Sequence, residues 1–251
     1  MRKTMKKILA VVLCLSVLLT ISPIAFAKEV IADDGGYNFK GVYRVQQGQL
    51  IKIQVPESIR GAEAHTFYID DESIAVSTQE DESGYISVIG RLWGATVISF
   101  ESYNVEKEEI DGELCDVYET VETLNYVIMV FDEEDANMTG KVTGVTVGDV
   151  NCHYDDEGEL NYEVEQDGEV YYDTIVYFED DGFVFDNYGS YHAYDRGNGE
   201  GILYVIDTNG NIVSDTFTAT AKMTPVQWIK SIIRDIFYLF INWLYGGFDY
   251  R

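Results

Sequence analysis

The residue types of a serine-hydrolase triad stand close together at Ser190, His192 and Asp195. A working triad brings a nucleophile, a base and an orienting acid together from separate elements of a fold. These three residues follow one another along one short segment, so they do not meet that requirement. The sequence also has no Gly-x-Ser-x-Gly elbow, no phosphate-binding glycine loop and no His-Glu-x-x-His zinc helix. We therefore expect a protein that is not an enzyme, with no catalytic residue and no cofactor.

The residues that commonly bind transition metals are scattered along the chain. His65, His153 and His192 are isolated from one another. Cys152 and His153 are neighbours, but neighbouring side chains of a strand point to opposite faces. We therefore expect no zinc site. Cys115 is the other cysteine of the body, and we expect it and Cys152 to be separate thiols, although export would permit a disulfide.

Short acidic runs are better candidates for an ion site. Calcium prefers six to eight oxygen ligands, which acidic turns can supply. None of the runs forms an Asp-x-Asp-x-Asp-Gly loop, so we expect a solvated surface that discourages edge-to-edge pairing of strands. The run from Asp132 to Asp135 is the strongest candidate for calcium, because an ion can stiffen a linker between domains. The runs are residues 70–72, 80–82, 132–135, 155–157 and 179–181.

Tyrosine is unusually frequent, with 19 residues in the chain. Exposed rings can stack on the faces of sugars, which raises the alternative of a carbohydrate-binding module in a secreted glycan-degrading system. Alternating tyrosines in strands more often belong to the core or to cross-strand pairs, and we favour that interpretation. The densest group is Tyr171, Tyr172, Tyr188, Tyr191 and Tyr194.

The charge balance narrows the choice of partner. The chain has 251 residues, of which 44 are acidic and 17 are basic, for a formal net charge of −27. Binding of DNA or RNA depends on a basic surface that releases counterions from phosphates, so we expect no nucleic-acid partner. The charge balance leaves both a protein and a glycan as possible ligands.

Short β-strands are the elements expected to position these residues. Between residues 28 and 223, apolar residues alternate with polar ones or form β-branched and aromatic runs, and no amphipathic helix is evident. Turn dipeptides such as Asp167-Gly168 and Asn209-Gly210 separate the runs and favour tight hairpins. The clearest strand candidates are residues 51–55, 95–100, 126–131, 141–147, 171–178, 202–206 and 216–221.

Many short strands with regular turns predict an all-β sandwich or barrel. The length of the body suits two tandem Ig-like β-sandwiches better than one, because each sandwich takes about 100 residues. The polar stretch 132–137 follows an apolar strand and marks the expected boundary. We therefore expect one sandwich at residues 28–134 and a second at residues 138–223.

Three short segments carry a family resemblance. They resemble the bacterial group 2 Ig-like domain, and they are Ser73-Ile74-Ala75-Val76, the turn residue Gly84 and the closing segment 94–99. The similarity covers residues 40–131 loosely, and it departs in the longer spacing from Gly84 to Gly94 and in an acidic hairpin inserted at 104–124. Residues 139–223 resemble the family only in their opening and closing strands. The resemblance implies Ig-like sandwiches of exported or surface proteins, often in tandem and often adhesive.

The N-terminal segment differs from the body. Arg2, Lys3, Lys6 and Lys7 precede an apolar stretch, and Ala25-Phe26-Ala27 offers small residues for cleavage. We expect residues 1–27 to be a secretory signal peptide. An uncleaved membrane anchor is the alternative, because the uncharged run 8–27 is long enough to span a bilayer.

The C-terminal segment, residues 224–251, predicts an amphipathic helix. Thr224 and Gln227 fit a capping box at its start, and polar residues then recur at spacings of three and four. Arg234 and Asp235 at its centre oppose insertion across a bilayer. We expect the helix to lie in the membrane interface, with packing on the body as the alternative. The expected membrane contacts are Trp228, Ile232, Ile236, Leu239 and Trp243.

Together these patterns predict an exported, non-catalytic protein with an adhesion or spacer role. Its expected location is secreted or on the extracellular cell surface, associated with the membrane. The expected partners are the membrane surface, through the C-terminal helix, and a protein or glycan ligand.

Overall fold

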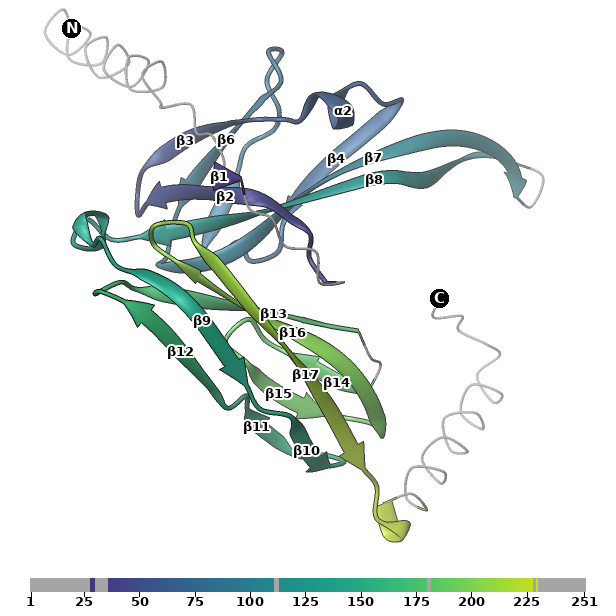
Figure 1. Ribbon diagram of the computed structural model, residues 1–251. Helices are drawn as coiled ribbons and strands as arrows, with labels where there is room; N and C mark the ends of the chain where they lie inside the picture. The colour runs from purple at the N-terminus through teal and green to yellow at the C-terminus, as the bar shows by residue number, and fades with distance from the viewer. Residues whose placement is uncertain (1–27, 30–35, 111–112, 180–181, 228, 230–251) are drawn as a thin grey trace, which may run out of the picture. The chain divides into compact units, whose positions relative to one another are not determined.

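The computed structural model describes residues 28–29, 36–110, 113–179, 182–227 and 229. In these residues the chain is built mostly of β-strands, as the alternation and turn spacing predict (Figure 1). The chain divides into two compact units. Unit 1 comprises Met1–Gly144, Glu165–Thr174 and Val205–Val213, and unit 2 comprises Val145–Val164, Ile175–Tyr204 and Ser214–Arg251.

The larger sheet of unit 1 has five strands in the order β1-β2-β8-β7-β4. β2 runs parallel to β8, with Val42 opposite Val127, and the other neighbouring strands are antiparallel. The predicted strands 95–100 and 126–131 lie within β7 and β8. The bounds are β1 (Lys28–Glu29), β2 (Phe39–Gln46), β4 (Ala64–Ile69), β7 (Gly94–Ile110) and β8 (Glu113–Phe131).

The smaller sheet of unit 1 consists of β3 (Leu50–Gln54), β6 (Tyr85–Gly90) and β5 (Ala75–Ser77), in the order β3-β6-β5. In β3 the buried side chains are Ile51 and Ile53, which confirms the alternation seen in the sequence. A single helical turn, α2 (Glu57–Arg60), follows β3 and buries Ile59. The sequence did not predict this turn, because four residues are too few to show a helical period.

The core of unit 1 lies between its two sheets. Ile53 and Ile86 of the smaller sheet are fully buried in one cluster with Phe100 and Ile128 of the larger sheet. Because the cluster takes side chains from both sheets, the two sheets form a sandwich. Burying one such side chain contributes about 1.5–3 kcal/mol, and truncating it to alanine costs about 2–5 kcal/mol.

β7 and β8 continue beyond the sandwich as a two-stranded ribbon (Figure 1). The pairing of β4 with β7 ends at Tyr103, and the pairing of β2 with β8 reaches no further than Asn125. A register shift between Ser102 and Tyr103 marks the start of the ribbon. The ribbon is the acidic hairpin that the sequence inserts at residues 104–124.

The second strand series forms three sheets, in the orders β10-β17-β16-β13, β11-β15-β14 and β12-β9. The predicted strands 141–147, 171–178, 202–206 and 216–221 correspond to β9, β13, β16 and β17. The bounds are β9 (Lys141–Val147), β10 (Val150–His153), β11 (Glu157–Glu159), β12 (Tyr162–Asp167), β13 (Tyr172–Phe178), β14 (Phe183–Phe185), β15 (Ser190–Ala193), β16 (Gly197–Asp207) and β17 (Ile212–Lys222).

An aromatic cluster joins two sheets of unit 2, with Phe183 and Phe217 buried in it. Phe178 of β13 stacks on Phe217 of β17 with ring centroids 5.9 Å apart, and it also contacts Phe183 and Phe185 of β14. Tyr191 of β15 joins the same cluster. These rings join strands of two different sheets, so the second series also packs as a sandwich.

Both series follow the same strand order. Lettered A to G in chain order from β2, the first series has sheets A-G-F-C and B-E-D. The second series repeats this order with its first two strands each divided. Strand A is β9 and β10, and strand B is β11 and β12; β9 pairs with β12, and β10 runs parallel to strand G, which is β17. An Ig-type sandwich also places C, F and G in one sheet and B, E and D in the other. The all-β prediction is confirmed, with Ig-type strand order in both series.

The expected domain boundary contains a short 3-10 turn, η1 (Asp135–Asn137). Within the described residues, no sheet combines strands from both sides of this turn. The compact units divide the chain differently, since Glu165–Thr174 and Val205–Val213 belong with unit 1. The domain limits 28–134 and 138–223 therefore stay a prediction.

Candidate functional site

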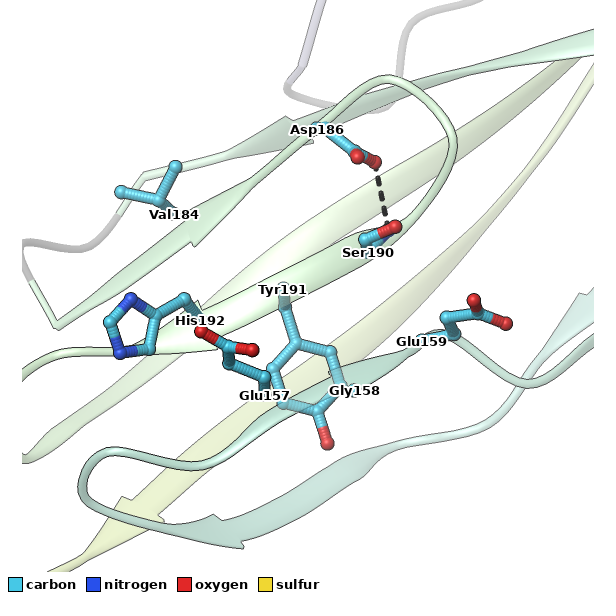
Figure 2. A pocket seen from close by; sticks show the side chains of 8 residues that line it. All are labelled: Glu157, Gly158, Glu159, Val184, Asp186, Ser190, Tyr191 and His192. Carbon is cyan, nitrogen blue, oxygen red and sulfur yellow. Dashed lines mark hydrogen bonds between the residues drawn. The ribbon is translucent and has the colours of Figure 1, made fainter.

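An open groove in unit 2 lies over the short sheet of β11, β15 and β14 (Figure 2). Its volume is about 490 Å³. His192 stands on the middle strand, with Glu157 opposite it on β11 and Val184 opposite it on β14. Cross-strand partners share one face of a sheet, so these three side chains line the groove together. The lining residues are Glu157, Gly158, Glu159, Val184, Asp186, Ser190, Tyr191 and His192.

Two local features give the groove its form. The carboxylate of Asp186 accepts hydrogen bonds from the backbone N–H groups of Tyr188 at 2.9 Å and Ser190 at 2.8 Å, and so closes the turn before β15. Gly158 leaves room for the ring of Tyr191, because a Cβ on Gly158 would lie 2.6 Å from the tyrosine hydroxyl oxygen. Burial raises the pKa of Tyr191, whose ring also belongs to the aromatic cluster.

The groove does not assemble the triad that its residue types suggest. His192 Nε2 lies 3.5 Å from Asp155 Oδ1, and both side chains are exposed. Asp195 accepts a hydrogen bond from the backbone N–H of Arg196 at 2.7 Å. An exposed pair such as His192 and Asp155 contributes at most about 1 kcal/mol. The groove is an open surface that carries the carboxylates of Glu157 and Glu159.

The five tyrosines singled out in the sequence have different surroundings. Tyr171 is half exposed and meets Trp93 edge to face, with ring centroids 6.5 Å apart. Tyr191 packs in the aromatic cluster, while Tyr188 and Tyr194 are exposed. By unit, Tyr171 and Tyr172 belong to unit 1, and Tyr188, Tyr191 and Tyr194 belong to unit 2.

A tyrosine group that the sequence analysis missed lies on the larger sheet of unit 1, and we call it the tyrosine face. It comprises Tyr68, Glu101, Tyr103 and Tyr118. Phe100 points into the core, so its neighbour Glu101 points outward, as does Tyr103 two residues on. The hydroxyl of Tyr68 donates to Glu101 Oε1 at 3.2 Å, and the hydroxyl of Tyr103 donates to the other carboxylate oxygen.

The ribbon completes the tyrosine face. Tyr118 meets Tyr103 edge to face, with ring centroids 6.1 Å apart and an interplanar angle of 83°. The hydrogen bond to Glu101 raises the pKa of Tyr103 to about 12. Alternation along β7 would have placed Glu101 and Tyr103 on one face. Only the strand register could add Tyr68, which lies opposite Ser99, and Tyr118, which lies opposite Val105.

Three of the acidic runs supply turn caps, whereas residues 180 and 181 of the run 179–181 lie outside the described residues. Asp71 accepts hydrogen bonds from the N–H and the hydroxyl of Ser73 at 2.8 and 2.6 Å. Asp81 accepts one from the N–H of Ser83 at 2.8 Å, and Asp156 caps the N–H three residues before it at 2.7 Å. Aspartate commonly stabilises turns in this way.

The run from Asp132 to Asp135 is organised by the backbone. Asp135 is buried, and its carboxylate accepts a hydrogen bond from the N–H of Asp132 at 3.2 Å. Among the described residues, no group of three or more His, Cys, Asp or Glu side chains is arranged to hold a metal ion. Cys115 and Cys152 are both free, as expected, and burial raises the pKa of the Cys152 thiol.

Asp207 of unit 1 is buried in a site lined by backbone N–H groups. Asp207 is fully buried and accepts hydrogen bonds from the N–H groups of Val142, Asn209 and Asn211 at 3.0, 2.9 and 2.8 Å. Asp207 closes the turn between β16 and β17, where Gly210 has a φ of +78°. These bonds occupy the carboxylate, so Asp207 is a structural residue.

The start of the expected C-terminal helix is described. The backbone N–H and the hydroxyl of Thr224 donate to Gln227 Oε1 at 2.9 and 2.8 Å. The backbone N–H of Gln227 donates in return to Thr224 Oγ1 at 3.3 Å, which completes the predicted capping box. Gln227 also donates to the carbonyl oxygen of Tyr154 at 3.2 Å. Within the described residues, no helix has the length and hydropathy needed to cross a bilayer. The expected membrane contacts Trp228, Ile232, Ile236, Leu239 and Trp243, like the expected signal peptide at 1–27, lie outside the described residues.

No family model matches the sequence, and no curated protein matches it either. Membership of the bacterial group 2 Ig-like family therefore stays a resemblance. Among solved structures, the tandem Ig repeats of Dlar match at 10% identity and a TM-score of 0.25, covering 72% of this chain and 92% of that one.

Two cadherin structures also match. Drosophila N-cadherin EC1-4 does so at 12% identity and a TM-score of 0.22, covering 67% of this chain and 44% of that one. The extracellular cadherin domains 1–5 of protocadherin gamma B2 match at 11% identity and a TM-score of 0.25, covering 78% and 41%. The chain thus spans less than half the length of these cadherin structures. The fold assignment rests on the strand order and the cores described above.

Proposed function

We propose that this chain is an exported, non-catalytic protein of the cell surface, with an adhesion or spacer role. The observation that carries the proposal is the repetition of one Ig-type strand order in both strand series. A repeated sandwich offers outward faces and loops to a partner while its cores remain closed. The short segments that resemble bacterial group 2 Ig-like domains support the same role.

Export and membrane attachment complete the proposal. The Ala-x-Ala site after an apolar stretch supports cleavage of residues 1–27. The capping box at Thr224 and Gln227 supports a helix that continues into the amphipathic segment. An amphipathic helix of this composition would hold the acidic body close to a membrane surface.

Cell fractionation tests the proposal. One strain produces the intact chain and another a chain truncated before Thr224, and both are compared by immunoblot of cytoplasm, membrane and medium. We expect the intact chain in the membrane fraction, accessible to added protease, and the truncated chain in the medium. A control with Ala25 and Ala27 replaced by aspartate should stay unprocessed. Retention of the intact chain in the cytoplasm would contradict the proposal.

A further inference from the structure

We propose that the tyrosine face and the adjoining ribbon form a docking surface for a basic polypeptide that presents arginine. The inference names the partner class for the proposed adhesive role, and in that sense it rests on the proposed function. Four properties carry it: exposed rings, an oriented carboxylate, an excess of acidic charge and an open strand edge.

The rings of the tyrosine face are available to a partner. Tyr118 is 58% exposed and Tyr68 is 46% exposed, although both are large and partly apolar. Val105 lies opposite Tyr118 in the ribbon register and extends the apolar stripe along the same face. Tyrosine and arginine are enriched among the few residues that dominate binding energy at protein interfaces.

Glu101 gives this face its preference for arginine. Its two carboxylate oxygens each accept one tyrosine hydroxyl, from Tyr68 and Tyr103. These bonds fix the orientation of the carboxylate and leave a second lone pair on each oxygen. A guanidinium group can then bind the carboxylate in a bidentate way and rest against a tyrosine ring. Lysine, as a point charge, gains less from this geometry.

The charge of the ribbon selects a basic partner. Residues 104–124 contain eight acidic residues and one lysine, a net charge of −7 and about twice the chain's average density of acidic residues. The single cation, Lys107, lies opposite Asp116 in the ribbon register. A second copy of this chain would bring like charge against like charge. A basic polypeptide is attracted, and the attraction weakens as salt screens it.

The β8 edge of the ribbon is open to a further strand, and within the described residues no strand pairs with the β7 edge beyond Tyr103. On the β7 side, the backbone N–H of Val105 donates to Glu63 Oε2 at 3.0 Å. On the β8 side, no strand pairs with the residues between Cys115 and Leu124 other than β7, within the described part of the chain. An extended peptide can add to such an edge, and its alternate side chains then meet the tyrosine face.

The test measures binding of the full chain to immobilised peptides. The probes are (Arg-Thr)6, (Lys-Thr)6 and (Glu-Thr)6, which alternate as strands do. We expect (Arg-Thr)6 to bind at least fivefold more tightly than (Lys-Thr)6, and (Glu-Thr)6 not to bind. Tyr118→Ala and Glu101→Gln should each weaken binding of (Arg-Thr)6 about tenfold. Raising NaCl from 50 to 300 mM should also weaken the binding of (Arg-Thr)6 to the unsubstituted chain.

Matched controls separate a site from general charge attraction. Tyr188→Ala removes an exposed tyrosine of unit 2, and Glu133→Gln removes an exposed acid outside the ribbon. Both should leave binding within twofold of the unsubstituted chain, and all variants should show unchanged thermal melting. Equal weakening by the controls, or equal binding of the arginine and lysine peptides, would overturn the inference.

Two further outcomes separate this inference from the proposed function. If the chain fractionates to the cell surface but (Arg-Thr)6 does not bind, the docking surface is wrong and the surface role stands. If immobilised polysaccharides bind instead and Tyr118→Ala abolishes that binding, the face serves a glycan and the polypeptide assignment falls.

Discussion

The carboxylate of Asp173 accepts a hydrogen bond from the backbone N–H of Ala95 at 2.6 Å, across 78 residues of sequence. Asp173 is buried, and burial raises the pKa of its carboxyl group despite this bond and one from the N–H of Thr174. Gly94 precedes the bonded residue with a φ of +142°, and a Cβ there would lie 2.8 Å from Asp173 Oδ2. The contact thus combines a costly buried charge with a backbone conformation that favours glycine.

The first prediction concerns the charge of Asp173. Because its pKa is raised in the folded chain, the folded state keeps the proton at pH values where the unfolded chain has lost it. Stability therefore falls as pH rises from the unfolded pKa, about 3.9, through the raised pKa of the folded state. The Asp173→Asn variant does not lose stability in this way, because the asparagine side chain does not ionise. We expect its stability relative to the unsubstituted chain to increase from pH 3.5 to pH 7 in urea unfolding.

Asp173→Ala serves as the control for that experiment. It removes the acceptor and leaves the N–H of Ala95 unsatisfied in a buried site, which costs about 1–3 kcal/mol. If Asp173→Asn is as damaging as Asp173→Ala at pH 7, the carboxylate charge is stabilising and the prediction is wrong.

The second prediction concerns Gly94. We expect Gly94→Ala to cost at least about 2 kcal/mol, because it adds a close contact to an unfavourable backbone conformation. Gly48→Ala is the matched control: its φ is +76° and its Cβ would meet nothing within 4 Å, so it should cost about 1 kcal/mol. Denaturant unfolding measures both. In an Asp173→Ala background the cost of Gly94→Ala should fall, and an unchanged cost would show that the close contact is unimportant.

The third prediction contrasts Asp207, another buried aspartate, with Asp173. The carboxylate of Asp207 accepts backbone N–H bonds on both oxygens and a further bond from Asn211 Nδ2 at 2.6 Å. Asparagine would turn an N–H toward one set of these donors. Asp207→Asn should therefore lower the free energy of unfolding by about 1–3 kcal/mol at pH 7. Asp173→Asn should not cause such a loss at this pH. Equal stability of the two variants at that pH would be the contrary result.

Seven strands, β3, β7, β8, β9, β13, β16 and β17, were predicted from sequence because they combine local signals. Ile51 and Ile53 alternate with polar residues, and Asn209-Gly210 provides a turn with Gly210 at positive φ. The pairing of β2 with β8 was not predictable, because parallel partners so distant in sequence leave no local pattern. The tyrosine face was missed for the same reason: Tyr68, Tyr103 and Tyr118 become neighbours only through register.

The acidic runs show a different limit of prediction from sequence. Composition identified them, but whether an aspartate binds an ion or caps a turn depends on where its carboxylate points. Asp71 and Asp81 accept hydrogen bonds from residues two positions later, which follows the Asx-turn pattern. That local rule could have been applied to the sequence before any ion site was considered.

The fourth prediction follows from these caps. Added calcium at 5 mM should leave the melting temperature of the full chain unchanged beyond the effect of equal ionic strength from magnesium. A native-state site at 100-fold saturation would add about 2.7 kcal/mol of stability and shift the melting temperature by several degrees. Such a shift, abolished when Asp132 and Asp135 are both changed to asparagine, would establish a calcium site at the expected boundary.

The last prediction concerns how the C-terminal segment meets a membrane. Ten Val, Ile, Leu and Phe residues between positions 225 and 245 favour insertion by roughly 3–6 kcal/mol in total. Arg234 and Asp235 near the centre oppose it by up to about 2.5–3.5 kcal/mol each, so lying in the interface is favoured over crossing. Alkaline carbonate should then release part of the membrane-bound chain. Ile236→Asp, on the expected apolar face, should shift the chain to the soluble fraction, whereas Asn242→Asp on the polar stripe should not. Complete resistance to carbonate would instead indicate a spanning segment, and solubility of the intact chain without detergent would rule out membrane contact.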